Sequence, residues 1–186
     1  GTAKDREKTD YVNLGGAVMG RLGSAKQATI LFTGPNGWRV DGQAAADLSL
    51  GIRLRAYKFD KYKTKKKDDN GASEGADSIN IALGDVAAAR KLAKVSESLA
   101  GGVIMARDLV NEPPNVLDPV EFAKRAEVLK ALGVEITVLD EKQLAKIGMR
   151  ALLGVGQGSR KESRVVIMKW NGAPNKKGPK GAPLAF

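Results

Sequence analysis

The chain has 186 residues, of which 42% are hydrophobic and 28% charged, as in folded globular proteins. It contains neither cysteine nor histidine, which excludes a disulfide framework, a Cys/His zinc site, a thiol nucleophile and a histidine-based triad within these residues. No apolar run approaches the roughly 18 residues of a membrane span, and the charged first ten residues lack a signal-peptide core. We therefore expect no membrane partner, and the absence of cysteine fits a reducing compartment, for which we expect the cytoplasm.

The chain carries 31 basic against 21 acidic residues, a net charge of +10. Such an excess indicates either an anionic partner such as nucleic acid or a solvated, lysine-rich surface. Residues 53–67 hold eight of the basic residues and one acid, and Tyr57, Phe59 and Tyr62 lie among them. Lysines interleaved with aromatic rings could follow a phosphate backbone and stack on bases. We favour a solvated loop, both here and for the second basic cluster at 160–180.

The first 111 residues predict an alternation of helices and strands. The pattern favours helices at 11–27 and 42–56, strands at 28–32 and 78–83, and a long helix at 85–111. Asp85 is the expected N-cap of the long helix, and Pro113 with Pro114 ends it. Its apolar positions form one stripe, Leu92, Val95, Leu99, Val103, Ala106 and Val110. The pair at 101–102 interrupts the stripe with glycine, for which we expect close packing against another backbone.

The last 75 residues predict a second α/β region. A helix begins at Asp118-Pro119 and ends at Gly133, and a shorter one runs over 140–147. The expected buried face of the first is Phe122, Ala126, Leu129 and Leu132. Strands are predicted at 134–138, 151–155 and 164–170, a loop at 171–180, and the start of a further strand at 183–186.

No group of residues in this pattern makes a self-contained active site. Residues 154–159 read GVGQGS, which lacks both GxGxxG and Gly-Lys-Ser/Thr, so we interpret them as a turn joining two strands. Glu112 could act as a general base but has no visible partner carboxylate or histidine, so a helix terminator is the better interpretation. The remaining candidates are interpreted as helix caps (Asp118, Asp140), isolated acids (Asp77, Asp85) and a strand end (Lys169, Trp170).

Four stretches nevertheless resemble one family, the leucyl (cytosol) aminopeptidases, in order and spacing. Residues 106–119, ARDLVNEPPNVLDP, resemble its A-R-x-L-x-N-x-P-x-N-x-x-x-P segment, which follows a helix linking two domains. Residues 148–159, GMRALLGVGQGS, resemble its G-M-x-x-L-x-x-V-x-x-G-S segment. Residues 164–172 resemble its strand ending in a Y/W-x-G turn, and residues 55–63 its Y-x-F-x-x-Y stretch. The resemblance extends over about residues 12–186.

The resemblance implies a metal-dependent exopeptidase that removes amino-terminal residues, often leucine, from peptides. It implies two α/β domains, a homohexamer, and two divalent ions, Mn or Zn, that share carboxylates and activate a water. The family's metal site contains V-G-K-G, F-D-x-G-G and N-x-D-A-E-G-R, and none of these occurs in the 186 residues. We therefore expect the metal ligands beyond Phe186 and assign no catalytic, substrate-binding or metal residue to this chain.

The sequence thus predicts an α/β fragment of such an enzyme, inactive by itself. We expect residues 1–84 to be the latter part of an amino-terminal domain, 85–111 a linker helix, and 112–186 the incomplete start of a mixed-sheet catalytic domain. The chain lacks an initiator methionine, so we expect its natural beginning to be missing or processed. The alternatives are a basic nucleic-acid-binding module and a non-catalytic structural subunit.

Overall fold

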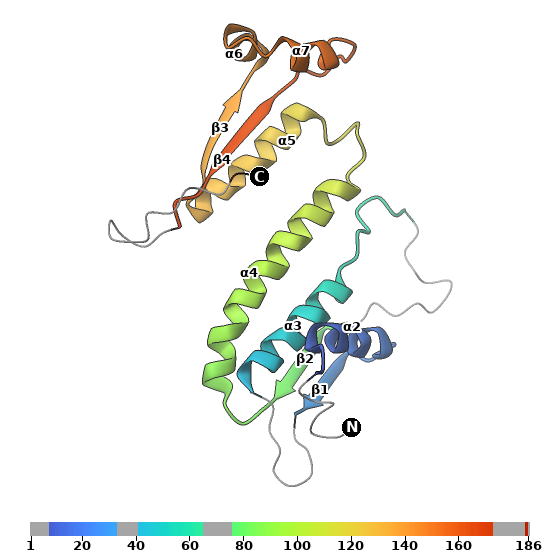
Figure 1. Ribbon diagram of the computed structural model, residues 1–186. Helices are drawn as coiled ribbons and strands as arrows, with labels where there is room; N and C mark the ends of the chain where they lie inside the picture. Colours follow the sequence, from blue (N-terminus) through green and yellow to red (C-terminus); the bar gives the residue numbers. More distant parts are fainter. Residues whose placement is uncertain (1–7, 33–40, 65–75, 173–184, 186) are drawn as a thin grey trace, which may run out of the picture. The chain divides into compact units, whose positions relative to one another are not determined.

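The computed structural model describes residues 8–32, 41–64, 76–172 and 185. It divides the chain into two compact units, Gly1–Asn111 and Glu112–Phe186, which Figure 1 shows as an α/β region each. This confirms the expected α/β class. Among the described residues, no helix is both long and apolar enough to cross a membrane.

The amino-terminal unit is built around a pair of parallel strands. Its elements are α2 (Tyr11–Arg21), β1 (Gln27–Leu31), α3 (Gly42–Ala56), β2 (Ser78–Ala82) and α4 (Val86–Asn111). The strands pair in a register that sets Ile30 beside Ile81. Alternate residues of both strands face the core, in which Leu48 and Ile52 of α3 pack with Phe32. All five elements lie close to the ranges that the sequence predicts, although α2 ends six residues earlier than expected.

Two glycines let α2 and α3 approach to backbone contact. A Cβ atom on Gly15 would collide with the carbonyl oxygen of Leu48, and one on Gly51 with that of Val12. Only hydrogen fits at these two positions, because the neighbouring atoms belong to the helix backbones and cannot rotate away. Gly15, one of the glycines that interrupt the predicted first helix, therefore allows its close crossing with α3.

The long helix α4 packs against α3, which lies alongside it in Figure 1. Its buried positions are small, Ala89, Ser96 and Ala100. The polar contacts include an ion pair of 2.8 Å between Arg53 and Glu97 and a 2.7 Å hydrogen bond that Arg107 donates to the carbonyl oxygen of Leu54. The predicted N-cap is confirmed, since the Asp85 side chain accepts a 3.0 Å hydrogen bond from the backbone N–H of Ala88.

The apolar stripe of α4 does not form the buried face of the helix. Val95 is 72% exposed, Leu99 56% and Val110 84%. The expectation of close packing at the two glycines is also wrong, because a Cβ atom on Gly101 or Gly102 would meet no atom of the described residues within 4 Å. Packing against α3 favours the side of the helix with small residues, and it leaves the larger apolar side chains outward.

The carboxyl-terminal unit contains one antiparallel strand pair and short helices. Its elements are α5 (Pro119–Ala126), the 3-10 helix η3 (Glu127–Leu132), β3 (Glu135–Leu139), α6 (Glu141–Lys146), α7 (Arg150–Gly156) and β4 (Val165–Lys169). The strands pair antiparallel, with Thr137 opposite Ile167. The predicted helix ends are confirmed at Gly133 and Gly148, whose φ of +84° in each case suits glycine. Ala123, Ala126 and Leu144 are buried.

Two predictions for this unit are wrong. Residues 151–155 form part of helix α7 rather than a strand, and a helix satisfies its backbone groups without a partner strand. Gly154–Ser159 consequently contains the end of α7 and a turn into β4, not a link between two strands. The expected buried face of α5 is only partly correct: Ala126 is buried, but Phe122 is 41% and Leu132 73% exposed. The segments 173–184 and 186, which include most of the predicted loop and final strand, lie outside the described residues.

Candidate functional site

The acidic side chains of the described residues are dispersed and serve structural roles. Asp118 and Asp140 cap α5 and α6 by accepting hydrogen bonds from the backbone N–H groups of Glu121 and Gln143, as predicted. At α6 the cap is a full capping box, because Gln143 also accepts from the backbone N–H of Asp140. Within the described parts of the chain, no three Asp or Glu side chains gather in a way that could hold a metal ion.

Glu112 is the most deeply buried carboxylate that the sequence singles out. Its side chain is 3% exposed and forms an ion pair of 2.9 Å with Arg125, which also contacts Glu121 at 3.0 Å. The hydrogen bonds that Arg125 donates to Glu121 and to Glu112 raise its pKa. A buried carboxylate that pairs with a guanidinium fits a structural role better than general-base catalysis. The Glu112–Arg125 ion pair therefore joins the start of the carboxyl-terminal unit to α5.

Asp118 holds a second long-range ion pair. Lys161 lies 2.8 Å from its carboxylate, whose side chain is 12% exposed. The Lys161 hydrogen bond, followed by that from the backbone of Glu121, lowers the pKa of Asp118 below 3.8. The same contact raises the pKa of Lys161 above 10.5. This pair ties the turn before β4 to the first turn of α5, so Asp118 is both a cap and an anchor.

The segment of lysines and aromatic residues after α3 makes mainly intramolecular contacts. The Tyr57 hydroxyl donates a 2.8 Å hydrogen bond to Asp108 and accepts one of 3.1 Å from Asn111. Burial, followed by Asp108, raises the pKa of Tyr57 above 10.0. Phe59 and Tyr62 pack on each other with ring centroids 5.8 Å apart.

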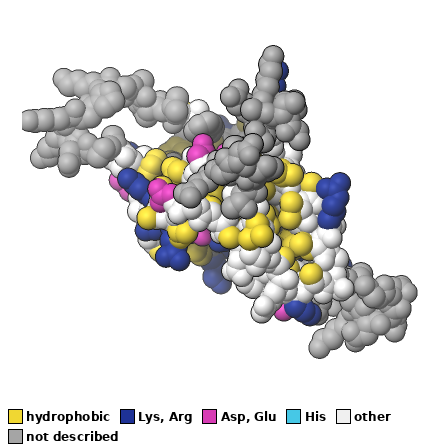
Figure 2. All heavy atoms as spheres, turned by 90° about the horizontal axis from the view of Figure 1, so that it is seen from below, with side chains coloured by type: hydrophobic (Ala, Val, Ile, Leu, Met, Phe, Trp, Pro, Cys, Tyr) yellow, Lys and Arg dark blue, Asp and Glu magenta, His cyan; other side chains and the backbone are white. Residues whose placement is uncertain are grey.

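The lysines of this segment are likewise partly engaged. Lys61 lies over the Tyr62 ring at 5.4 Å, and Lys63 forms an ion pair with Asp60. Residues 65–67 lie outside the described residues. Figure 2 shows the described lysine and arginine side chains scattered among hydrophobic ones on the face that it presents. These contacts explain Tyr57 as an anchor of the segment on α4, and they leave nucleic-acid binding as an untested hypothesis.

The second basic cluster is also engaged within its own unit. Lys161 pairs with Asp118, Arg164 with Glu162, and Lys169 with Glu135 across the strand pair at 3.6 Å. Its residues 176, 177 and 180 lie outside the described part of the chain. Of its described residues, Lys161, Arg164 and Lys169 are thus accounted for by ion pairs within the unit.

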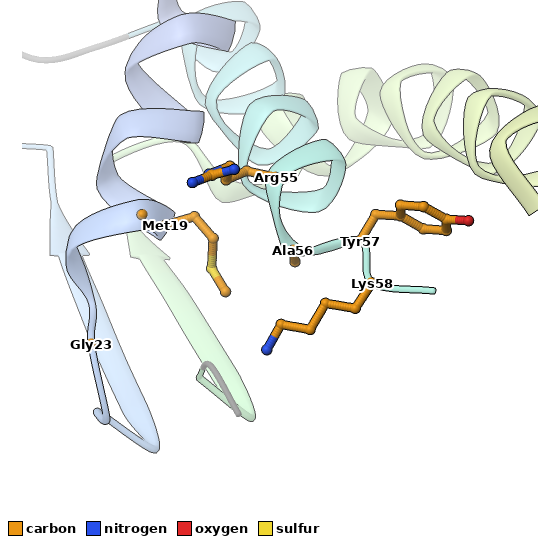
Figure 3. Close-up of a pocket in the computed structure, with 7 residues that line it drawn as sticks. Met19, Gly23, Arg55, Ala56, Tyr57 and Lys58 are labelled. Atoms are coloured by element: carbon orange, nitrogen blue, oxygen red, sulfur yellow. The ribbon is translucent and has the colours of Figure 1, made fainter. Parts of the chain in front are cut away.

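A cavity of about 320 Å³ lies between the end of α2 and the end of α3. Its lining includes Met19, Gly20, Arg55 and Lys58, with no acidic residue. Figure 3 shows the Tyr57 ring pointing away from the cavity while Lys58 extends along it. The cavity offers positive charge and apolar surface, but neither a nucleophile nor an acid–base pair, so its residues do not form a hydrolytic site.

Comparisons with known proteins match both units to one family. The profile of the cytosol aminopeptidase family, N-terminal domain, matches residues 1–66, and that of the same family's catalytic domain matches residues 104–182. A probable cytosol aminopeptidase of Rhizobium rhizogenes is 51% identical over 182 residues, which cover 96% of this chain and 36% of that protein. One of Xanthobacter autotrophicus is 51% identical over 176 residues, 94% of this chain and 35% of that protein.

Solved structures show the same fold. The bottromycin maturation enzyme BotP in complex with Mn aligns with a TM-score of 0.68 at 22% identity, covering 89% of this chain and 33% of that one. A mutant of tomato leucine aminopeptidase aligns with a TM-score of 0.70 at 21% identity, covering 84% and 32%.

The fold is α/β, and the two profiles belong to one family. The chain belongs to the cytosol aminopeptidase family, as the resemblance predicts. It spans about a third of the length of the curated relatives that it matches.

The family's metal requirement can be compared with the side chains that this chain supplies. A pair of divalent ions needs several oxygen ligands converging on one point. No three described Asp or Glu side chains converge in that way, and Asp118, Asp140 and Glu112 are instead caps or ion-pair partners, so the described acids do not fit such a centre. No catalytic step is therefore derived from these residues.

Proposed function

We propose that this chain is part of a metal-dependent aminopeptidase that hydrolyses amino-terminal peptide bonds. The observation that carries the proposal is the presence of both family profiles in one chain, with about half identity to named relatives over nearly its whole length. Peptide substrates, a homohexameric assembly and a cytoplasmic location are parts of the same proposal. So is the use of two divalent ions, Mn or Zn, whose ligands lie outside these 186 residues.

In this proposal the 186 residues are structural rather than catalytic. Residues 1–84 are the latter part of the amino-terminal domain, 85–111 the linker helix, and 112–186 the start of the catalytic domain. The Glu112–Arg125 and Asp118–Lys161 pairs would hold the beginning of that domain in shape. By themselves the 186 residues would neither bind the metal pair nor release an amino acid.

The experiment compares the product of the complete gene with the isolated 186-residue chain. Both are assayed with Mn on leucine p-nitroanilide and on its N-acetylated form, which lacks the free amine of an aminopeptidase substrate. We expect the complete product to cleave only the free-amine substrate and to lose this activity after chelation and dialysis. The isolated chain should cleave neither. Cleavage of the free-amine substrate by the isolated chain would contradict the structural role.

A further inference from the structure

Asparagine is a labile residue wherever its side-chain amide can react with the backbone. In that reaction the backbone nitrogen of the next residue attacks the Cγ atom of the asparagine, so the next residue and the local structure decide whether it occurs. The described residues include the asparagines Asn13, Asn80, Asn111, Asn115 and Asn171. Among these described asparagines, Asn171 is the one that is followed by glycine.

The other described asparagines lie in surroundings that oppose this attack. Asn13 lies within α2, Asn80 within β2, and Asn111 is the last residue of α4. Asn115 is exposed in a turn, but it is followed by Val116. The branched side chain of Val116 crowds the approach, and its N–H already donates a 2.9 Å hydrogen bond to a backbone carbonyl oxygen.

The surroundings of Asn171 favour the attack. Asn171 and Gly172 are both exposed, and they follow β4, which ends at Lys169. Their backbone therefore lies outside the strand pairing that fixes the dihedral angles of β4. Gly172 has no Cβ atom to obstruct the approach to Cγ of Asn171, and it can adopt the backbone conformations that ring closure needs.

The structure also explains why glycine follows this asparagine. The indole ring of Trp170 lies against Gly172, where a Cβ atom would collide with three carbon atoms of the ring. Any larger residue at position 172 would have to displace the ring. The packing of Trp170 therefore favours the labile Asn-Gly dipeptide at the end of β4.

We propose that Asn171 is a site of spontaneous deamidation, at which water converts asparagine to aspartate and isoaspartate without an enzyme. The Gly172 nitrogen loses its proton and attacks Cγ of Asn171; a C–N bond forms, and the bond from Cγ to Nδ2 breaks as ammonia leaves. Water then adds to either carbonyl of the cyclic imide and breaks one of its C–N bonds. The balance is the loss of ammonia and the gain of water, with no oxidation or reduction. This proposal does not rest on the proposed function.

The two products would change the end of β4 in different ways. Both add a carboxylate two residues from Lys169, whose ammonium lies 3.6 Å from Glu135. Isoaspartate also adds a methylene group to the backbone between Trp170 and Gly172. The longer backbone would shift Gly172 relative to the indole ring that now lies against it.

The first test is a timed incubation of the product of the complete gene in mildly alkaline, heavy-oxygen water. Each sample is digested with trypsin in ordinary water, and tandem mass spectrometry assigns every modified residue. Heavy oxygen then marks only the deamidation that occurs during the incubation. Asn115 is the matched control, because it is also exposed outside helices and strands but is followed by valine. Asn36 and Asn70 also precede glycine, but they lie outside the described residues and in other tryptic peptides.

We expect Asn171 to deamidate roughly tenfold faster than Asn115, or more, because glycine leaves its nitrogen accessible and valine does not. No conversion at Asn171, or equal rates at the two positions, would overturn the proposal.

The second test separates the effect of glycine from that of exposure. Trp170→Ala removes the ring, so that Gly172→Ala can be added without the collision. Asn171 should deamidate readily in Trp170→Ala and several times more slowly in the double variant, because the added methyl group hinders the attack. Equal rates in these two variants would refute the role assigned to Gly172. Both tests read a mass rather than an activity, so this proposal and the proposed function fail separately.

Discussion

At the scale of single residues, the carboxyl-terminal unit depends on two ion pairs that connect distant parts of its sequence. Arg125 joins the buried Glu112 to Glu121, and Lys161 joins the turn before β4 to the cap of α5 at Asp118. Both pairs include a carboxylate largely shielded from water, which is where an ion pair is most sensitive to the loss of its partner. We therefore expect the removal of these side chains to destabilise this unit most.

The Asp118–Lys161 pair predicts how stability depends on pH. The folded pKa of Asp118 lies below 3.8, so its contribution is present above that value and is lost as the pH falls through the folded pKa. Asp118→Asn keeps a good N-cap but loses the charge. It should lower the urea midpoint at pH 7 and reduce the further loss as the pH falls from about 4 through the folded pKa of Asp118. Asp140→Asn is the control, because Asp140 caps α6 in the same way and forms no ion pair with the described residues; an equal effect there would contradict the account.

Arg125 is expected to be the most sensitive basic residue of this unit. Arg125→Ala deprives the buried Glu112 carboxylate of its guanidinium, and a buried charge that loses a partner is strongly destabilising. Lys130→Ala removes an exposed pair with Glu127, which contributes little. Thermal unfolding followed by circular dichroism should show a clear drop in Tm for the first variant and almost none for the second. Similar Tm values for both would show that the buried pair has no structural role.

Sequence reasoning can predict the contacts that are local at this scale but not the distant ones. The caps at Asp85, Asp118 and Asp140 follow from residue type and position, and the structure confirms them. Arg125 is four residues from Glu121, a spacing that signals a helical ion pair. Its pairing with Glu112 has no such signal, because a non-helical segment separates the two. The contacts of Tyr57 with Asp108 and Asn111 of α4 are also distant in sequence. The sequence alone therefore allows Tyr57 to be interpreted as a base-stacking residue.

At the scale of elements, the crossing of α2 and α3 depends on glycine. Gly51→Ala would drive a methyl group into the carbonyl of Val12, so we expect a loss of about 3 kcal/mol in unfolding free energy. Gly101→Ala lies in open space on α4 and should instead add up to about 1 kcal/mol through helix propensity. Urea unfolding of both variants measures the difference. A neutral Gly51→Ala would mean that α2 and α3 do not cross as closely as described.

The misassigned element shows what limits prediction at this scale. Residues 151–155 read as a short apolar run, which fits a strand or a buried helix equally by periodicity. The surroundings of these residues decide between helix and strand. β3 and β4 pair with each other. Gly156 of α7 leaves room for the Ser163 side chain, with which a Cβ atom on residue 156 would collide. In the same way, the stripe on α4 predicts a helix correctly, but small residues on another side decide which face is buried.

At the scale of the whole molecule, motifs identify the family more directly than composition does. The segments at 106–119 and 148–159 point to the cytosol aminopeptidases, and the two family profiles confirm it. Composition and charge alone leave a basic α/β protein with several possible partners. The metal centre cannot be located from these residues, because no three of the described acids come together and Asp118, Asp140 and Glu112 are held in caps or ion pairs.

The central claim is that these residues are the structural part of a two-metal aminopeptidase. The most direct test is to determine the coding sequence immediately downstream of the Phe186 codon. The account predicts Val-Gly-Lys-Gly, followed further on by an aspartate-containing glycine turn and an Asn-x-Asp-Ala-Glu-Gly-Arg segment. A stop codon, or a continuation that lacks the lysine and the carboxylates, would contradict the claim and exclude two-metal hydrolysis for this gene product.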